Sequence, residues 1–211
     1  MKIIILFTAL LFFHLNAFSQ EKIEEGIATF EFNYPDAESV SPQTLANLGS
    51  GITVYFKKGL SREEYDNTGR WVNIVDPKKK EILSMGTPAQ DIATKMTFKE
   101  KADNQAMAFR KYSVRVTDEV KDIVGLQCKK AFVIYNDGQT MEVWYSSQLD
   151  ACNTQYFFNG IDGFIMQYSH VITLYPDIKF TVEMICKKVE KTKISESMFK
   201  LPANCKLVTA N

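Results

Sequence analysis

Residues 128–146 read CKKAFVIYNDGQTMEVWYS and place a polar turn, NDGQ, between two runs of apolar, β-branched and aromatic residues. An Asp-Gly pair between such runs is the strongest short-range signal for a β-hairpin. Similar runs, in which apolar and polar residues alternate, recur along the chain at residues 26–34, 51–59, 70–76, 80–86, 112–118, 164–175 and 178–191. The sequence therefore predicts a mainly β fold built on an antiparallel sheet.

Three short segments predict helices. Residues 41–49, SPQTLANLG, begin with Ser41 as the N-cap and Pro42 at the first helical position, and they end at a glycine. Residues 88–96, PAQDIATKM, and residues 195–199, SESMF, each predict a further turn or two. Because the chain has no internal repeat and no linker, we expect one large antiparallel sheet with a few short helices, an α+β arrangement.

The first nineteen residues predict a signal peptide. Lys2 gives a positive start, residues 3–15 form an apolar run, and Ala17-Phe18-Ser19 supplies small residues at a cleavage site. The run is too short to cross a bilayer comfortably, and no later stretch approaches a membrane span. We therefore expect a signal peptide at residues 1–19, a single domain at residues 20–211, and a protein in the periplasm or associated with the outer envelope.

The charges are balanced. The chain carries 25 basic and 25 acidic side chains, so losing Lys2 with the leader leaves 24 against 25, a net charge of −1. This balance gives no reason to expect nucleic acid as a partner. The densest basic run, DPKKKE at residues 76–81, is flanked by acids and predicts a solvated hairpin turn; an anion site is the alternative.

An exported protein meets an oxidising compartment, which predicts two disulfides among Cys128, Cys152, Cys186 and Cys205. If the last four long strands form a meander, Cys128 and Cys186 lie two strands apart, about 10 Å or more. A disulfide needs Cα atoms closer than about 7 Å, so that pair is excluded. The remaining pairings are Cys128–Cys152 with Cys186–Cys205, favoured by its shorter loops, or Cys128–Cys205 with Cys152–Cys186.

The chain offers little material for catalysis. After loss of the leader its sole histidine is His170, inside a strand segment, and neither G-x-S-x-G nor C-x-x-C occurs. Glu63 and Glu64 are adjacent, so in a strand they point to opposite faces and cannot share one substrate. We expect no enzyme activity, no cofactor and no metal site.

Residues 159–169, NGIDGFIMQYS, combine two glycines with an apolar run. Gly160 and Gly163 permit positive φ, which predicts a turn leading into a strand. A ligand loop is the alternative, but the segment has neither G-x-G-x-x-G nor Walker spacing, and no helix follows it. One face of the following strand carries Phe164, Met166, Tyr168, His170, Ile172 and Leu174.

This segment resembles the one that names the GLPGLI family of exported bacterial envelope proteins, in which a Gly-apolar-Pro-Gly turn precedes an apolar strand. Asp162 stands here at the position of that proline. Residues 116–146 resemble the family's central hairpin, residues 61–85 an upstream hairpin, and residues 195–206 the closing Ser-x-x-x-Phe-x-x-Pro tail. Together these segments cover most of residues 50 to 206, and their order and spacing carry the resemblance.

The resemblance implies a LolA/LolB-like lipoprotein-carrier architecture. In that architecture an antiparallel sheet curls into an incomplete barrel, helices lie over its concave side, and a hydrophobic cavity can take acyl chains. The GLPGLI family has no established activity, so the resemblance implies a fold more than a function.

The candidate site is the apolar face of three successive strands, which carries adaptable methionines. We expect it to bind or shelter an acyl chain, a lipid or a lipidated partner in the concavity of the sheet, without catalysis. The predicted contacts are Met141, Val143, Phe164, Met166, Tyr168, Phe180, Val182 and Met184. The alternative is an envelope protein–protein interaction module with a solid core, whose partners would meet the exposed edges or turns.

Overall fold

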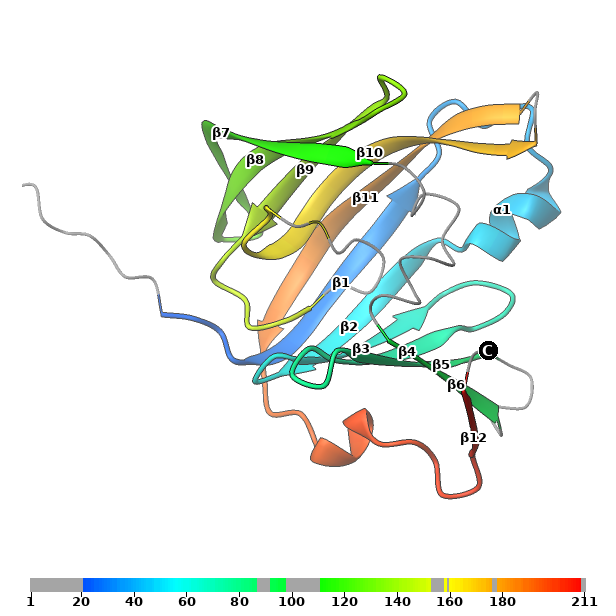
Figure 1. Ribbon diagram of the computed structural model, residues 1–211, viewed down its shortest axis with the longest axis vertical. Helices are drawn as coiled ribbons and strands as arrows, with labels where there is room; N and C mark the ends of the chain where they lie inside the picture. Colours follow the sequence, from blue (N-terminus) through cyan, green and yellow to red (C-terminus); the bar gives the residue numbers. More distant parts are fainter. Residues whose placement is uncertain are drawn as a thin grey trace, which may run out of the picture.

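The computed structural model describes residues 21–86, 92–97, 111–152, 158, 160–175 and 178–209. The strands of this part form one sheet in the order β12-β6-β5-β4-β3-β2-β1-β11-β10-β9-β8-β7. Neighbouring strands are antiparallel except for the parallel pair β12 and β6. The sheet is strongly curved and does not close into a barrel (Figure 1). The predicted fold class, a curved antiparallel sheet that forms an incomplete barrel, is confirmed.

The strands are β1 (Glu25–Asn33), β2 (Gly51–Lys57), β3 (Leu60–Tyr65), β4 (Val72–Asp76), β5 (Glu81–Met85), β6 (Ile92–Thr97), β7 (Tyr112–Ile123), β8 (Leu126–Tyr135), β9 (Thr140–Ser146), β10 (Phe164–Tyr175), β11 (Ile178–Lys191) and β12 (Lys206–Thr209). The described residues also contain an α-helix, α1 (Pro42–Leu48), and a 3-10 helix, η1 (Glu196–Phe199). The strands β7 to β11 follow one another as a meander, as expected, and β11 then pairs with β1.

The turns follow the chemistry of their residues. The hairpin of β8 and β9 has Gly138 at φ 84°, and the amide of Tyr135 donates to the carbonyl of Gln139 at 2.9 Å. In the segment that leads into β10, Gly160 has φ 104°. Gly163 is required for another reason: a Cβ there would lie 2.7 Å from the carbonyl oxygen of Ser146 on β9. The predicted hairpin turn is confirmed. The turn predicted before β10 is confirmed at Gly160, whereas Gly163 does not adopt a positive φ and residue 159 lies outside the described residues.

The helices predicted at residues 41–49 and 195–199 are confirmed. The Ser41 hydroxyl accepts from the amide of Thr44 at 3.2 Å and begins α1, which ends at Gly49. The Ser195 hydroxyl caps η1 in the same way. The helix predicted across residues 88–96 is wrong where it can be compared, because Ile92–Thr97 forms β6. Pairing with β5 and β12 decides this segment, since it gives the backbone cross-strand partners. Residues 88–91 lie outside the described residues, as does the predicted signal peptide.

The core consists of two clusters on opposite faces of the sheet. The larger one covers the side we call the inner face, which carries Phe30, Val54 and Met184. The smaller one lies on the outer face of β4 to β6, where Ile74 and Met85 pack against Phe199 and other residues of the C-terminal segment. Figure 1 shows that segment passing below β2 to β5, on the side away from β7 to β10.

The structure contains none of the predicted disulfides, and in it Cys128, Cys152, Cys186 and Cys205 are free thiols. The two clusters explain this, since Cys128 and Cys186 belong to the larger cluster and Cys205 packs with the smaller one. Either predicted pairing would join Cys205 to one of these two thiols across the sheet. Burial raises the pKa of Cys186, and the nearby charge of Cys128 raises it further. Cys128 and Cys186, the pair that the sequence argument set aside, therefore lie on the same side of the sheet.

Candidate functional site

The eight residues predicted to contact a ligand lie on β9, β10 and β11, which are neighbours in the sheet. Cross-strand pairing places Val143 opposite Tyr168, and Tyr168 opposite Met184. Residues directly opposite one another share a face, so these three form a row across the inner face. All eight are buried in one cluster, with exposed fractions between 0% and 8%: Met141, Val143, Phe164, Met166, Tyr168, Phe180, Val182 and Met184.

The apolar face extends beyond these eight residues onto β1 and β2. The ring of Phe30 lies 5.8 Å from that of Phe164, and the ring of Tyr34 lies 6.1 Å from that of Phe180. On β2, Val54 and Phe56 continue the same surface, because they lie opposite Ala28 and Gly26 of β1. The alternation of residues 26–34 and 51–59 marks these residues as buried, but nothing in the sequence indicates that β1 pairs with β11.

Tyr34 stands where the inner face meets the segment before α1. Its hydroxyl donates to the carbonyl of Gly49 at 2.5 Å, and burial raises its pKa to about 12. Nearby, the carboxylate of Asp36 accepts hydrogen bonds from the amide and the hydroxyl of Thr181, at 2.6 and 2.9 Å. These contacts fix the connection between β1 and α1 against β11.

On β3 to β5 one row of the inner face is polar, although the row beside it, in which Val75 lies opposite Ile82, is apolar and fully buried. Val54 of β2 lies opposite Glu63 of β3, and Glu63 lies opposite Asn73 of β4, which in turn lies opposite Ser84 of β5. Glu63 is 2% exposed and accepts a hydrogen bond from the hydroxyl of Tyr65 at 2.9 Å. The hydroxyl of Ser84 donates to Asn73 Oδ1 at 2.6 Å. An apolar ligand on the inner face would therefore avoid this polar row.

Sequence reasoning did not find this polar strip, although it placed Glu63 and Glu64 on opposite faces, which is confirmed. Glu64 lies on the outer face and accepts from Arg62 Nε at 2.6 Å. The alternation of Ser61, Glu63 and Tyr65 was an available signal, but it resembles an ordinary solvated strand face. Only the pairing of β3 between β2 and β4 turns these side chains inward.

The three thiols that lie away from the outer-face cluster are poor nucleophiles. Burial raises the pKa of Cys128 to about 11, that of Cys186 to about 12 and that of Cys152 to about 12, where the nearby charge of Glu63 adds to the effect. The amide of Cys152 donates to the hydroxyl of Ser61 at 2.8 Å, which holds this segment against β3. Thiols held protonated in this way do not serve as catalytic thiolates near neutral pH.

His170 is buried on the inner face, 4% exposed, and its ring centroid lies 6.1 Å from that of Tyr135. It lies opposite Val182, so it belongs to the apolar surface of β10 and β11. Within the described ranges, no group of three or more His, Cys, Asp or Glu side chains could hold a metal ion. No helix of the described residues is long and apolar enough to cross a membrane.

No family model and no curated protein matches the chain. Among solved structures, PNGF-II is similar with a TM-score of 0.55 and 14% identity, over 89% of this chain but 31% of PNGF-II. An uncharacterized conserved protein from Thermus thermophilus is similar with a TM-score of 0.50 and 11% identity, over 89% of this chain and 91% of its own. MucB aligns with a TM-score of 0.41 and 14% identity, over 92% of this chain and 63% of MucB.

The chain thus spans about a third of PNGF-II. At these identities the first two likenesses show the fold alone, and the alignment with MucB supports no argument. Membership of the GLPGLI family stays a prediction.

Proposed function

We propose that the chain is an exported, non-enzymatic envelope protein that binds an acyl chain, a lipid or a lipidated partner on the apolar inner face of its sheet. The observation that carries the proposal is the continuous surface formed by β9, β10, β11, β1 and β2. Its members are buried in one cluster, which includes Met141, Met166 and Met184. Flexible, polarizable methionines suit a surface that accommodates chains of different shape.

The proposed location follows from the predicted signal peptide at residues 1–19 and from the resemblance to the GLPGLI family. A LolA/LolB-like carrier uses the concave side of the same kind of open sheet, which agrees with the curved, unclosed sheet seen here (Figure 1).

The direct test is to purify the protein from cell envelopes and to analyse it by native mass spectrometry and lipid extraction. The proposal predicts a copurified lipid or acyl species, and a rise in melting temperature with members of a fatty-acid and phospholipid panel. An empty protein whose melting temperature no panel member changes would contradict it.

A matched pair of variants tests whether the inner face has room for a ligand. Val182 lies on the inner face of β11, and Val171 lies 45% exposed on the other side of β10. If a cavity lies over β11, Val182→Phe folds with a stability close to that of Val171→Phe but loses lipid. If the interior is filled, overpacking makes Val182→Phe less stable by about 1–3 kcal/mol.

A second candidate function is a protein–protein interaction module, and edge strand β7 favours it. Val116 and Val120 on this strand are 46% and 54% exposed, and among the described strands β7 pairs only with β8. An exposed edge can accept a strand from a partner. Val120→Lys would then remove a stoichiometric protein partner in pull-downs from envelope extract while leaving any bound lipid in place.

A further inference from the structure

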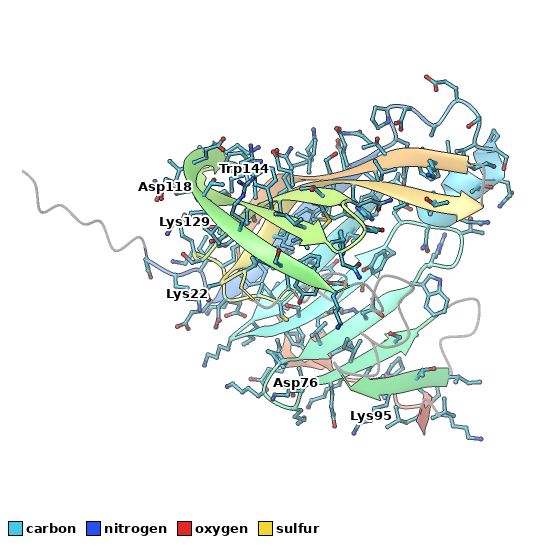
Figure 2. The ribbon with its side chains drawn as sticks, turned by 45° about the horizontal axis from the view of Figure 1, so that its top comes forward. Lys22, Asp76, Lys95, Asp118, Lys129 and Trp144 are labelled. Atoms are coloured by element: carbon cyan, nitrogen blue, oxygen red, sulfur yellow. The ribbon has the colours of Figure 1, made fainter. Side chains whose placement is uncertain are left out.

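A cavity of about 350 Å³ lies on the outer face, far from the candidate site. It is formed where the β2–β3 turn, the β4–β5 turn and η1 meet. Figure 2 shows Asp76 in the lower part of the molecule, whereas Trp144 and Lys129 lie in the upper part. Its volume falls within the range of about 300–1,000 Å³ that is usual for small-molecule sites.

The cavity is apolar at its base and charged at its rim. Ile74 is buried, and Leu60, Leu83 and Phe199 are half-buried. The charged residues that line it are four lysines and three acids: Lys57, Lys58, Lys79, Lys200, Asp76, Glu81 and Glu196. An apolar base below a charged rim fits a ligand that is itself amphipathic.

Existing contacts occupy most of these charges. Lys57 pairs with Glu25 at 3.1 Å, and Lys79 pairs with Asp76 at 3.2 Å. Burial would raise the pKa of Asp76, but hydrogen bonds from the amides and the side chain of the β4–β5 turn outweigh it and lower that pKa. Asp76 is therefore a carboxylate whose charge is already balanced by hydrogen bonds and an ion pair within the β4–β5 turn.

The lysines of the rim that form no ion pair determine which ligand charge the cavity favours. Glu81 pairs with Lys95. In the part of the chain that the structure describes, Lys58 and Lys200 form no ion pair, and Glu196 is the one acid of the lining that likewise forms none. Two cations against one anion favour a negatively charged ligand group.

The wall that η1 provides is fixed in place. Lys57 Nζ donates to the carbonyl of Ile194 at 3.0 Å, and Arg62 donates to the carbonyl of Met198 at 3.2 Å. Glu25 accepts from the amide of Ile194. Because side chains of β1, β2 and β3 hold the backbone before and within η1, Phe199 is held over Ile74 and Leu83 of the outer-face cluster. A preorganised wall lowers the cost of ordering a site upon binding.

We infer that this cavity binds a small amphipathic anion, a carboxylate carried on a short acyl chain or an aromatic ring. The apolar part lies against Ile74, Leu83 and Phe199, and the carboxylate lies between Lys58 and Lys200. This site is independent of the inner face, and it develops the anion-site alternative for the basic run at residues 76–81.

The test is a methyl-NMR titration of the full mature protein with octanoate. We expect shifts of the Ile74 and Leu83 methyl signals and a dissociation constant on the order of 1 mM. Octan-1-ol and octylamine carry the same chain without the negative charge, and they should bind at least about tenfold more weakly. The methyl signals of Met141, Met166 and Met184 report the inner face separately, so this proposal and the proposed function can fail independently.

The matched variants are two double charge reversals. Lys58→Glu with Lys200→Glu should weaken octanoate binding about tenfold or more, because the rim becomes negative. Lys111→Glu with Lys129→Glu makes the same change in net charge at exposed positions outside the cavity and should leave binding unchanged. Equal weakening in both, binding of octan-1-ol as tight as that of octanoate, or no shift at Ile74 and Leu83 up to about 10 mM octanoate would overturn the inference.

Discussion

The strands β8 to β11, together with β1 and β2, pack their core on the inner face of the sheet, whereas β4 to β6 pack a smaller core on the outer face beneath the C-terminal segment. The change of face occurs at β3. Its inner side chains include Ser61 and Glu63, which lie opposite Phe56 and Val54 of β2. The inner surface is therefore apolar over one half of the sheet, whereas in the other half a polar row, formed by Glu63, Asn73 and Ser84, lies beside the buried Val75 and Ile82.

The difference shows that a strand's alternation gives two faces without saying which one is covered. In β4, four consecutive residues are buried, so its pattern favours neither side. What decides the outer side is the tail: Phe199 and Leu201 cover Ile74 and Leu83. Because the tail is the last part of the chain, the burial of β4 to β6 depends on a contact made between distant parts of the sequence.

The largest effect should come from the inner core. Phe180→Ala removes a ring that is 1% exposed and lies against Tyr34, so we expect a loss of about 3–5 kcal/mol in the free energy of unfolding. Chemical denaturation measures it. Val171→Ala, at an exposed position on the neighbouring strand, is the control and should cost under about 0.5 kcal/mol. A loss below about 1.5 kcal/mol for Phe180→Ala would mean that the inner face is loosely filled at this point.

A smaller and local effect should come from the outer cluster. Phe199→Ala combined with Leu201→Ala removes two half-buried side chains from the outer face of β4 and β5. We expect a loss of about 2 kcal/mol, and faster amide hydrogen exchange confined to β3–β6, β12 and the C-terminal segment.

Exchange in β8 to β11 should keep its native rate in that variant, because these strands hold the other core. If amide exchange became faster over the whole sheet instead, the two clusters would unfold as one unit. The two halves would then differ in structure but not in local stability.

The sequence predicted β8 to β11, where neighbours in the chain pair with one another, better than β4 to β6, whose burial depends on the C-terminal segment. The hairpin of β8 and β9, the meander from β8 to β11 and the eight inner residues follow from alternation and from one Asp-Gly turn. The helix expected across residues 88–96 failed at Ile92–Thr97 because β5 and the parallel strand β12 supply its partners. Strand β3, LSREEY, has a composition that does not favour a strand.

The absence of the predicted disulfides from the structure has a related reason. The oxidising compartment is a property of the cell, whereas pairing requires thiols on the same side of the sheet and within reach. The polar strip on the inner face of β3 to β5 was also beyond reach, because only the three-dimensional pairing shows that Glu63 faces the core.

The thiols allow the two regions to be compared chemically. Burial raises the pKa of Cys128 to about 11 and that of Cys186 to about 12, in the larger cluster, whereas Cys205 is half-buried in the smaller one. At pH 8 the native protein should react with iodoacetamide first at Cys205. Cys128 should react about a hundredfold more slowly than it does in denaturant, and Cys186 about a thousandfold more slowly, because little thiolate forms.

Peptide mass spectrometry after timed alkylation gives the order of reaction. The intact mass should correspond to four thiols, and a mass lower by four hydrogens would restore the disulfide prediction. The raised pKa values also have a consequence for stability: their contribution is fully present below the unfolded thiol pKa of about 9 and is lost as the pH rises through about 11–12.

The smallest effect should come from Asp36, which ties the segment before α1 to β11 at the open end of the inner face. Hydrogen bonds from the amide and then the hydroxyl of Thr181 lower the pKa of this carboxyl. A lowered folded pKa stabilises the native state above the unfolded pKa, about 3.9, and this stabilisation is lost as the pH falls through the folded value. Asp36→Asn should therefore flatten the decline of the urea midpoint below about pH 4, while Asp118→Asn, on edge strand β7, controls for the lost charge. If the urea midpoint declines in parallel in the wild type and in Asp36→Asn, the hydrogen bonds between Asp36 and Thr181 do not hold this end of the inner face. The ring contact between Tyr34 and Phe180 would then secure it instead.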